Sequence, residues 1–260
     1  MDEVSTGTDN ATIGDISTVA EPSPETANLF IDILGNDLSD LNQELEKMSL
    51  LFSGDNFSED LIKTMVEYSN ICNYVHLPLQ AGSNRVLNLM NRNYTKEEFL
   101  DLVDLIRTHM PDCSISTDII VGFPGETDDE FKETLEVVNK VRFDFAYMFK
   151  YSPRPGTKAA EYTNQIDEKV KQNRLAELIE IQNSIRLEVN KERIGSVQKV
   201  LIEKESKKSK EFWSGRTDGN VWTILKKGNE SVGDIVDVVI TDAQGVTLFG
   251  ENINYKGEIS

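Results

Sequence analysis

The sequence predicts an α/β region followed by a small, separate all-β region. Between residues 57 and 194, short β-branched and apolar segments alternate with helical patterns of 14 to 16 residues, an order typical of βαβ units. After Gly195 the hydrophobic period changes from that of a helix to the alternation of strands. Five such segments follow within about 60 residues, separated by turns, which indicates a small closed barrel. We therefore expect βαβ units with a parallel sheet, a connecting helix and a five-stranded antiparallel barrel.

The N-terminal part differs from the rest in composition. Residues 1–27 are rich in Thr, Ser, Gly and acids and have few large apolar side chains, so we expect a disordered acidic leader. Residues 28–56 have apolar side chains at mixed spacing, which predicts one or two short helices of unclear role. Because residues 1–46 hold eleven acids and no base, much of the net charge of −18 belongs to this part.

The α/β region begins with helical spacing over residues 58–68 and a strand pattern over 72–80 that runs into a loop. The next helix should begin at Thr95, whose hydroxyl can form a capping box with Glu98, and should end near His109. Helix and strand therefore alternate from the start of this region.

The same alternation continues toward the C-terminus. A β-branched strand is expected over residues 113–121, then a helix capped by Thr127 with Glu130, then a strand over 143–151. Residues 167–193 have one charged and one apolar face, which predicts a long connecting helix ended by glycine. We assign residues 57–194 to this α/β region and its connecting helix.

The all-β region should occupy residues 195–253, with residues 254–260 as a tail. The expected strands cover residues 197–202, 213–217, 221–225, 235–240 and 246–250. Barrels of this size and strand number include oligonucleotide-binding folds.

Composition excludes several classes of protein. No apolar run is long enough to cross a membrane and the N-terminus lacks the features of a secretory signal, so we expect a cytoplasmic protein without membrane contact. Cys72 and Cys113 are the only cysteines, too few for a zinc ribbon or an iron–sulfur cluster. We expect both cysteines to be buried, the two histidines to be hydrogen-bonded, and no metal site.

Three loops follow the predicted parallel strands. In an α/β barrel the functional groups lie on the loops at the C-terminal ends of the strands. They cover residues 76–84, 116–127 and 150–157, and they offer hydrogen-bonding side chains, a Gly-Pro-Gly turn and a cation beside an aromatic ring. Each loop alone is equally well explained as a turn or a helix cap. Asp118 is the strongest candidate for ligand contact, because a carboxylate within an apolar strand must be paired or face a polar cavity.

The small barrel carries a local excess of positive charge. Residues 204–227 hold seven bases against three acids, and phosphate attraction acts within about a Debye length. Candidate RNA contacts in this stretch are Lys207, Lys208, Lys210, Trp213, Arg216 and Lys227. We expect Trp213 to be the exposed, stacking tryptophan and Trp222 to lie in the core. The alternative is that the aromatic side chains fill the core and the lysines only solvate a hairpin.

Several motifs occur together and in order. They are residues 74–83 (Tyr-Val-His-Leu-Pro-Leu-Gln-Ala-Gly-Ser), 89–94 (Leu-Met-Asn-Arg-Asn-Tyr), 116–127 (Ser-Thr-Asp-Ile-Ile-Val-Gly-Phe-Pro-Gly-Glu-Thr) and 149–159. The combination resembles the radical-SAM tRNA methylthiotransferase family, with Ala81 in place of that family's serine. The C-terminal unit is similar to the RNA-binding TRAM domain. The resemblance covers about residues 57–253 and implies a TIM-like radical-SAM barrel, here partial, followed by a TRAM barrel.

The resemblance also implies an activity and cofactors. Enzymes of this family add a methylthio group to an isopentenyl-type adenosine beside the tRNA anticodon, and they use S-adenosylmethionine and 4Fe-4S clusters. The TRAM resemblance favours tRNA over a ribosomal protein as the partner. The family's Cys-x-x-x-Cys-x-x-Cys loop does not occur in this sequence. The positions that would face S-adenosylmethionine and substrate are Gln80, Ser83, Asp118, Gly122, Glu126 and Arg154.

Two functional hypotheses follow. The first is a methylthiotransferase family member, truncated or rearranged, that lacks its cluster cysteines; a polypeptide that supplies the missing N-terminal half is a candidate partner. The second is a non-catalytic TRAM-type RNA-binding protein whose partial barrel is a remnant. In both hypotheses the partner is tRNA.

Overall fold

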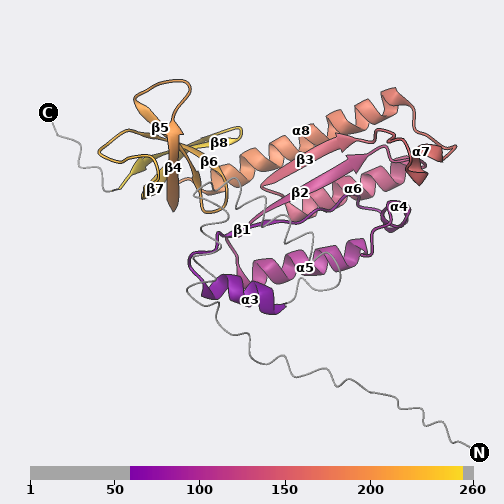
Figure 1. Ribbon diagram of the computed structural model, residues 1–260, viewed down its shortest axis with the longest axis horizontal. Helices are drawn as coiled ribbons and strands as arrows, with labels where there is room; N and C mark the ends of the chain where they lie inside the picture. Colours follow the sequence, from indigo (N-terminus) through magenta and orange to yellow (C-terminus); the bar gives the residue numbers. More distant parts are fainter. Residues whose placement is uncertain (1–58, 254–260) are drawn as a thin grey trace, which may run out of the picture. The chain divides into compact units, whose positions relative to one another are not determined.

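The computed structural model describes residues 59–253, which lie within one compact unit (Figure 1). The expectations for residues 1–27, 28–56 and 254–260 fall outside this range. Within it, a parallel sheet with helices is followed by a long helix and a closed β-barrel, as the change of hydrophobic period at Gly195 predicts.

A three-stranded parallel sheet forms the first part. Its strands are β1 (Tyr74–His76), β2 (Ser114–Val121) and β3 (Phe145–Lys150), in that order across the sheet. Asp118 of β2 lies beside Tyr147 of β3 in the register. All three strands occur where the sequence predicts them, although β1 is shorter than the predicted 72–80.

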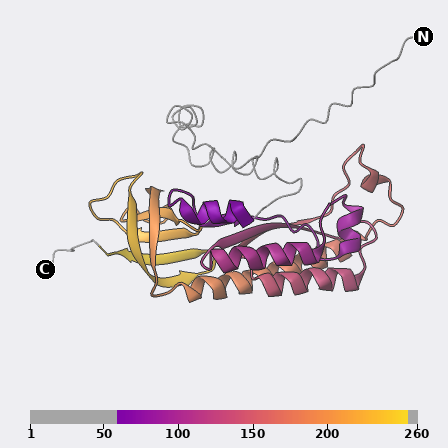
Figure 2. The same cartoon turned by 90° about the horizontal axis from the view of Figure 1, so that it is seen from below.

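Three helices cover one face of this sheet (Figure 2). They are α5 (Lys96–His109), α6 (Asp128–Val141) and α8 (Glu168–Glu192), and their apolar side chains join those of the strands in one buried core. Thr95 and Thr127 form the two predicted capping boxes, so helix position follows directly from local sequence.

Three shorter helices complete this part. Helix α3 (Glu59–Glu67) matches the helical pattern over residues 58–68. Helices α4 (Asn84–Leu89) and α7 (Lys158–Glu161) were not predicted, because the sequence interpretation assigned no element to residues 85–94 and 158–166. Ser83 caps α4 through its side-chain oxygen.

The second part is a closed barrel in the order β4-β5-β6-β8-β7. Its strands are β4 (Val197–Glu205), β5 (Phe212–Thr217), β6 (Trp222–Lys226), β7 (Ile235–Gln244) and β8 (Thr247–Asn252). The predicted five strands are confirmed, but β6 and β8 pair in parallel, so the barrel is not wholly antiparallel. The reason is geometric: directions cannot alternate around a closed ring with an odd number of strands.

Candidate functional site

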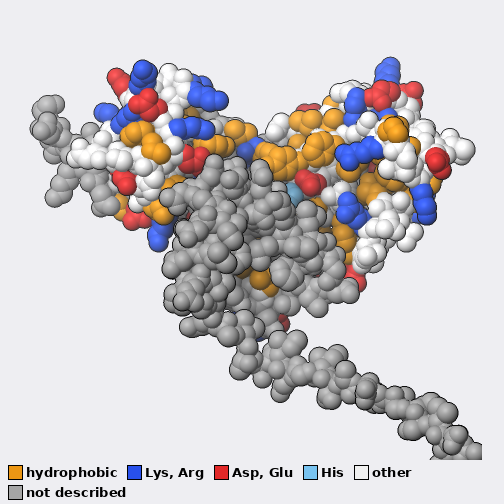
Figure 3. Space-filling model, in the orientation of Figure 1, with side chains coloured by type: hydrophobic (Ala, Val, Ile, Leu, Met, Phe, Trp, Pro, Cys, Tyr) orange, Lys and Arg blue, Asp and Glu red, His pale blue; other side chains and the backbone are white. Residues whose placement is uncertain are grey.

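The face of the parallel sheet opposite α5, α6 and α8 carries polar and aromatic side chains, and we call it the aromatic face. Since side chains alternate along a strand, every second residue of each strand lies on it. These residues are Tyr74, His76, Ser114, Ser116, Asp118, Ile120, Phe145, Tyr147 and Phe149. Figure 3 shows hydrophobic side chains gathered over this part of the molecule. Phe145 and Tyr147 pack edge to face, with ring centroids 4.6 Å apart.

A short polar network crosses the aromatic face. The Ser116 hydroxyl lies 2.6 Å from the Tyr74 hydroxyl and 2.7 Å from Nδ1 of His76. Nε2 of His76 lies 3.5 Å from a carboxylate oxygen of Asp118. His76 is hydrogen-bonded, as expected, and Asp118 faces this polar network. The carboxylate is about one-third exposed, so it remains accessible to a ligand.

Gln80 extends the pairing of β1 and β2 beyond the end of β1. Its N–H donates to the carbonyl of Asp118 at 2.8 Å, and its own carbonyl accepts from Ile120 at 2.9 Å. The backbone of Gln80 has φ of 65°, a region that non-glycine residues seldom adopt. The side chain is buried, so the structure places Gln80 and Asp118 together through their main chains.

The side chain of Ser83 is hydrogen-bonded to another residue of the protein. Its hydroxyl donates to Glu130 at 3.1 Å, and Arg85 donates to both oxygens of the same carboxylate at 2.6 and 2.7 Å. The guanidinium of Arg85 lowers the pKa of Glu130 to about 2. Ser83 therefore joins α4 to the start of α6.

Glu126 and Gly122 also make contacts within the protein. One oxygen of the buried Glu126 carboxylate accepts from the Gly122 N–H at 2.6 Å and from Arg174 at 2.7 Å. Burial raises the pKa of Glu126. Gly122 has φ of +71°, and a Cβ there would lie 2.2 Å from the side chain of Lys171. These contacts fix the turn after β2, so they explain both residues without a ligand.

Arg154 lies on the exposed loop after β3. The carbonyl of Arg154 accepts from the N–H and the hydroxyl of Thr157, at 3.2 and 2.8 Å, which shapes the loop. Of the six residues predicted to face S-adenosylmethionine and substrate, Asp118 and Arg154 thus have accessible charged side chains.

Lys207, Lys208 and Lys210 lie exposed on the loop between β4 and β5, and we call residues 206–211 the lysine loop. Arg216 and Lys227, by contrast, have acidic partners. Arg216 donates to Glu203 at 2.5 Å, and Lys227 pairs with Glu205. The predicted cationic residues therefore divide into an exposed loop and a paired group on the barrel wall.

The structure does not divide the two tryptophans into one exposed and one core residue as predicted, since both are half-buried and each has a lysine over its ring. Trp213 packs against the barrel core opposite Leu225, and its indole nitrogen is buried. Trp222 lies on the outer surface of β6, where Nζ of Lys204 approaches its ring centroid to 4.5 Å and the guanidinium carbon of Arg216 to 5.4 Å. The prediction relied on the position of Trp213 next to the basic loop. Strand alternation predicts side-chain orientation better, because the residue after Trp222 points inward and Trp222 itself points outward.

The sequence interpretation also missed residues that gather at the aromatic face. Phe145, Tyr147 and Phe149 occupy alternate positions on one strand, a period-two signal that predicts a shared face. Arg186 of α8, which lies over the ring of Phe145 at 4.6 Å, has no comparable signal, because its position depends on how α8 packs on β3.

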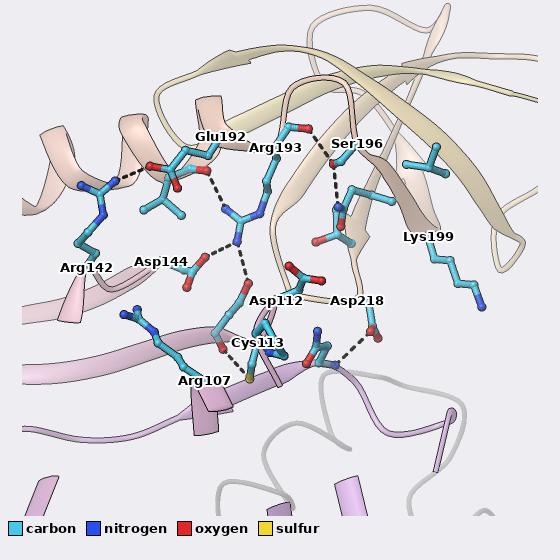
Figure 4. Close-up of a pocket in the computed structure, with 18 residues that line it drawn as sticks. Arg107, Asp112, Cys113, Arg142, Asp144, Glu192, Arg193, Ser196, Lys199 and Asp218 are labelled. Carbon is cyan, nitrogen blue, oxygen red and sulfur yellow. Dashed lines mark hydrogen bonds and ion pairs between the residues drawn. The ribbon is translucent and has the colours of Figure 1, made fainter. Parts of the chain in front are cut away.

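A cavity of about 690 Å³ lies where the amino ends of the strands meet the barrel (Figure 4). Arg193 at the end of α8 pairs with Asp144 and donates to Ser114 at 3.0 Å. Asp218 of the β5–β6 turn accepts from the N–H of Asn73 at 3.1 Å. The cavity is thus lined by residues of both parts, and Arg193 and Asp218 contribute contacts between the long helix, the sheet and the barrel.

Comparison with known proteins agrees with this architecture. The Radical SAM superfamily matches residues 16–138 and the TRAM domain matches residues 191–253. The tRNA-2-methylthio-N(6)-dimethylallyladenosine synthase of Christiangramia forsetii is 45% identical over 211 residues, and the alignment covers 80% of this chain. The synthase of the same name from Thermoanaerobacter sp. is 47% identical over 195 residues. Most of this chain therefore matches part of a radical-SAM tRNA methylthiotransferase.

The match to this family is partial in length. The chain spans 44% of the Christiangramia relative and 41% of the Thermoanaerobacter relative. The Radical SAM match begins at residue 16, well before the motifs that start at residue 74. Among solved structures, coproporphyrinogen III oxidase from Escherichia coli, a radical SAM enzyme, is similar with a TM-score of 0.43 and 17% identity, over 63% of this chain and 44% of that one.

The residues of this chain do not fit an iron–sulfur cluster. Cys72 is exposed, contrary to the prediction that both cysteines are buried, whereas burial raises the pKa of Cys113 to about 12. No group of three or more His, Cys, Asp or Glu side chains that could hold a metal occurs within residues 59–253. With two cysteines in the whole sequence, the cluster ligands of the methylthiotransferase family are absent. No helix in the same range is long and apolar enough to span a membrane.

Proposed function

We propose that this chain is the RNA-binding and partial-barrel component of an enzyme that methylthiolates an isopentenyl-type adenosine beside the tRNA anticodon. The observation that carries the proposal is 45% identity over 80% of the chain to a tRNA-2-methylthio-N(6)-dimethylallyladenosine synthase. The TRAM match over residues 191–253 supports tRNA as the partner.

The cluster chemistry requires residues from outside this sequence. Because the chain has two cysteines, we propose that another polypeptide supplies the cluster ligands and the N-terminal half. The side chains of Ser83 and Glu126 already have partners within the protein, so they do not support a contact with S-adenosylmethionine. Asp118 and Arg154 are the residues proposed to contact cofactor or substrate, since each presents an accessible charge.

The contribution of this chain itself is to bind and orient RNA. The exposed lysines of the lysine loop supply charge for phosphate oxygens, and such contacts position a nucleic acid without reading its sequence. The domain boundaries proposed here are residues 57–194 for the partial barrel with its connecting helix and 195–253 for the TRAM domain.

Anaerobic reconstitution tests the assignment of the cluster ligands. We expect the chain alone to bind tRNA but to hold no stoichiometric iron and sulfide. Adding the N-terminal half of a close relative should then produce methylthiolated adenosine in tRNA that already carries the isopentenyl group, detected by mass spectrometry. A stoichiometric cluster on the isolated chain would contradict the assignment.

A second candidate function is RNA binding without catalysis. The lack of cluster ligands in this sequence favours it. It predicts tRNA binding that is unchanged by the added N-terminal half, with no methylthiolated product under any reconstitution condition. The same experiment therefore separates the two functions.

A further inference from the structure

A second cavity lies where the outer surface of β6 meets the aromatic face. Its volume is about 160 Å³, and Phe145, Tyr147, Arg186 and Trp222 contribute to its wall. A protein cavity of about 150 Å³ can hold a benzene molecule. The cavity therefore suits a single flat ring system rather than a longer segment of a ligand.

The wall of this cavity presents ring faces and edges. Tyr147 is 46% exposed although it is a large aromatic residue within a strand, and the neighbouring Phe149 is 53% exposed. Exposed aromatic side chains on a sheet surface are the platforms on which proteins stack unpaired nucleic acid bases. Trp222 approaches from the barrel side, so the cavity is lined by aromatic residues from both parts of the protein.

Arg186 supplies a cation that forms no ion pair among the described residues, although the charge of the nearby Asp144 acts on it. Its guanidinium lies 4.6 Å from the ring centroid of Phe145, and no hydrogen bond or ion pair to it is found among residues 59–253. Arg186 is half-buried, and this burial lowers the pKa of its guanidinium. A partly buried guanidinium with unused N–H groups favours an anionic ligand, and phosphate matches its geometry.

The charges around the cavity favour an anion as well. Asp144 lines it but is paired with Arg193, and Arg216 is paired with Glu203. Nζ of Lys204 lies over the Trp222 ring and adds a further positive charge beside the cavity. The acids of this region are neutralised, whereas Arg186 and Lys204 are not paired with an acid among the described residues.

We propose that this cavity binds one unpaired nucleotide of an RNA strand, with its base against Tyr147 and Trp222 and its phosphate on Arg186. The proposal rests on the RNA binding proposed above and adds a contact outside the lysine loop. Paired bases are not available for stacking on such a surface, so the site selects single-stranded RNA.

The two tryptophans of the chain make the site directly observable. In a Trp213→Phe variant, Trp222 is the only tryptophan, and a short single-stranded oligoadenylate should quench its fluorescence to saturation. Arg186→Gln should weaken oligoadenylate binding roughly tenfold, as loss of a charge-assisted contact does. Tyr147→Ala should weaken it by roughly 5- to 150-fold, the range for loss of one stacked base.

Arg92→Gln is the matched control, because it removes an equal charge from an exposed position after α4. It should change affinity less than about twofold. An equal loss from both arginine variants would show an effect of net charge and overturn the proposal, as would quenching that Arg186→Gln leaves unchanged. If Trp213→Phe fails to fold, the quenching of the native chain is compared with that of Trp222→Phe. Equal quenching in the two proteins would also overturn it.

Anisotropy of labelled tRNA with the native chain keeps this proposal separate from the proposed function. Loss of tRNA binding when the lysine loop is neutralised, with no effect of Arg186→Gln on oligoadenylate, would support the TRAM function and refute the nucleotide site. Absence of tRNA binding by the native chain would refute the proposed function, whereas saturable oligoadenylate quenching would still support the site.

Discussion

Arg174 shows how one residue can fix a loop that sequence motifs suggest is a ligand site. It bridges the buried Glu126 and the exposed Asp128, and the Glu126 carboxylate in turn binds the backbone of Gly122. A buried ion pair of this kind fixes the conformation of the turn, whereas its net contribution to the free energy of folding is small. The turn after β2 is therefore held by the protein's own charges.

Removing Arg174 should be strongly destabilising. Arg174→Met leaves the Glu126 carboxylate buried without its cation, which costs about 3–5 kcal/mol in free energy of unfolding. Urea denaturation followed by circular dichroism measures the loss. Asp128→Asn removes the exposed partner of the same arginine and should have only a small effect; similar losses in both variants would contradict this account.

Glu130 should make the fold acid-sensitive. Its pKa is lowered to about 2 from an ordinary 4.5 by Arg85, so its stabilisation is present above about pH 4.5 and is lost as pH falls toward about 2. Because Arg85 is half exposed, the expected contribution is about 1–2 kcal/mol. Arg85→Gln should destabilise at pH 7 and lose less on acidification than the native chain. Parallel pH profiles of unfolding free energy for the two proteins would exclude the effect.

At the scale of elements, strand alternation decides the roles of the two tryptophans. Trp213 pairs with Leu225 in the barrel register and lies on the inner side, whereas Trp222 pairs with Arg216 and lies on the outer side. The position of each tryptophan in the strand register thus predicts the orientation of its side chain better than the residues next to it in the sequence do.

Alanine at the two positions should give opposite results. Trp213→Ala should lower the free energy of unfolding by about 3 kcal/mol, because it removes a large ring from the barrel core. Trp222→Ala should change stability by less than about 1 kcal/mol and weaken RNA binding instead. Thermal denaturation and RNA titration of both variants provide the measurements, and a larger stability loss at Trp222 would contradict the assignment.

At the scale of the whole described unit, Arg193 links the long helix to the sheet beside the barrel. It pairs with Asp144 and donates to Ser114, while Asn190 of the same helix donates to the carbonyl of Gly245 in the barrel at 3.0 Å. These contacts orient the barrel relative to the aromatic face. We therefore expect an RNA strand bound to the barrel to contact the aromatic face as well.

Arg193→Met should loosen this junction without unfolding either part. Hydrogen exchange should increase at the start of β2 and at the β5–β6 turn, while the strands of the barrel remain protected. Arg142→Met, which removes only exposed ion pairs with Glu188 and Glu192, is the control. Equal hydrogen exchange in the native and Arg193→Met proteins would show that Arg193 does not hold the sheet and the barrel together.

RNA binding by the whole chain should depend on salt through the lysine loop. Each phosphate contact on a single-stranded segment contributes about −0.7 to the slope of log affinity against log salt concentration. Neutralising Lys207, Lys208 and Lys210 to glutamine should flatten the slope by about 2 units for an anticodon stem–loop. An unchanged slope would show that this loop makes no phosphate contact.

Sequence alone determined the long helices and the strands but not the short helices α4 and α7, because helix caps, hydrophobic periods and turns are local. The capping boxes at Thr95 and Thr127, the long helix and the five barrel strands all follow from residues close together in the chain. The tertiary structure decided which side chains remain available to a ligand. Ser83 and Glu126 have internal partners 47 and 48 positions away, and Arg186 reaches the aromatic face only because α8 packs on β3. Contacts over such separations depend on packing between elements, which local patterns do not encode.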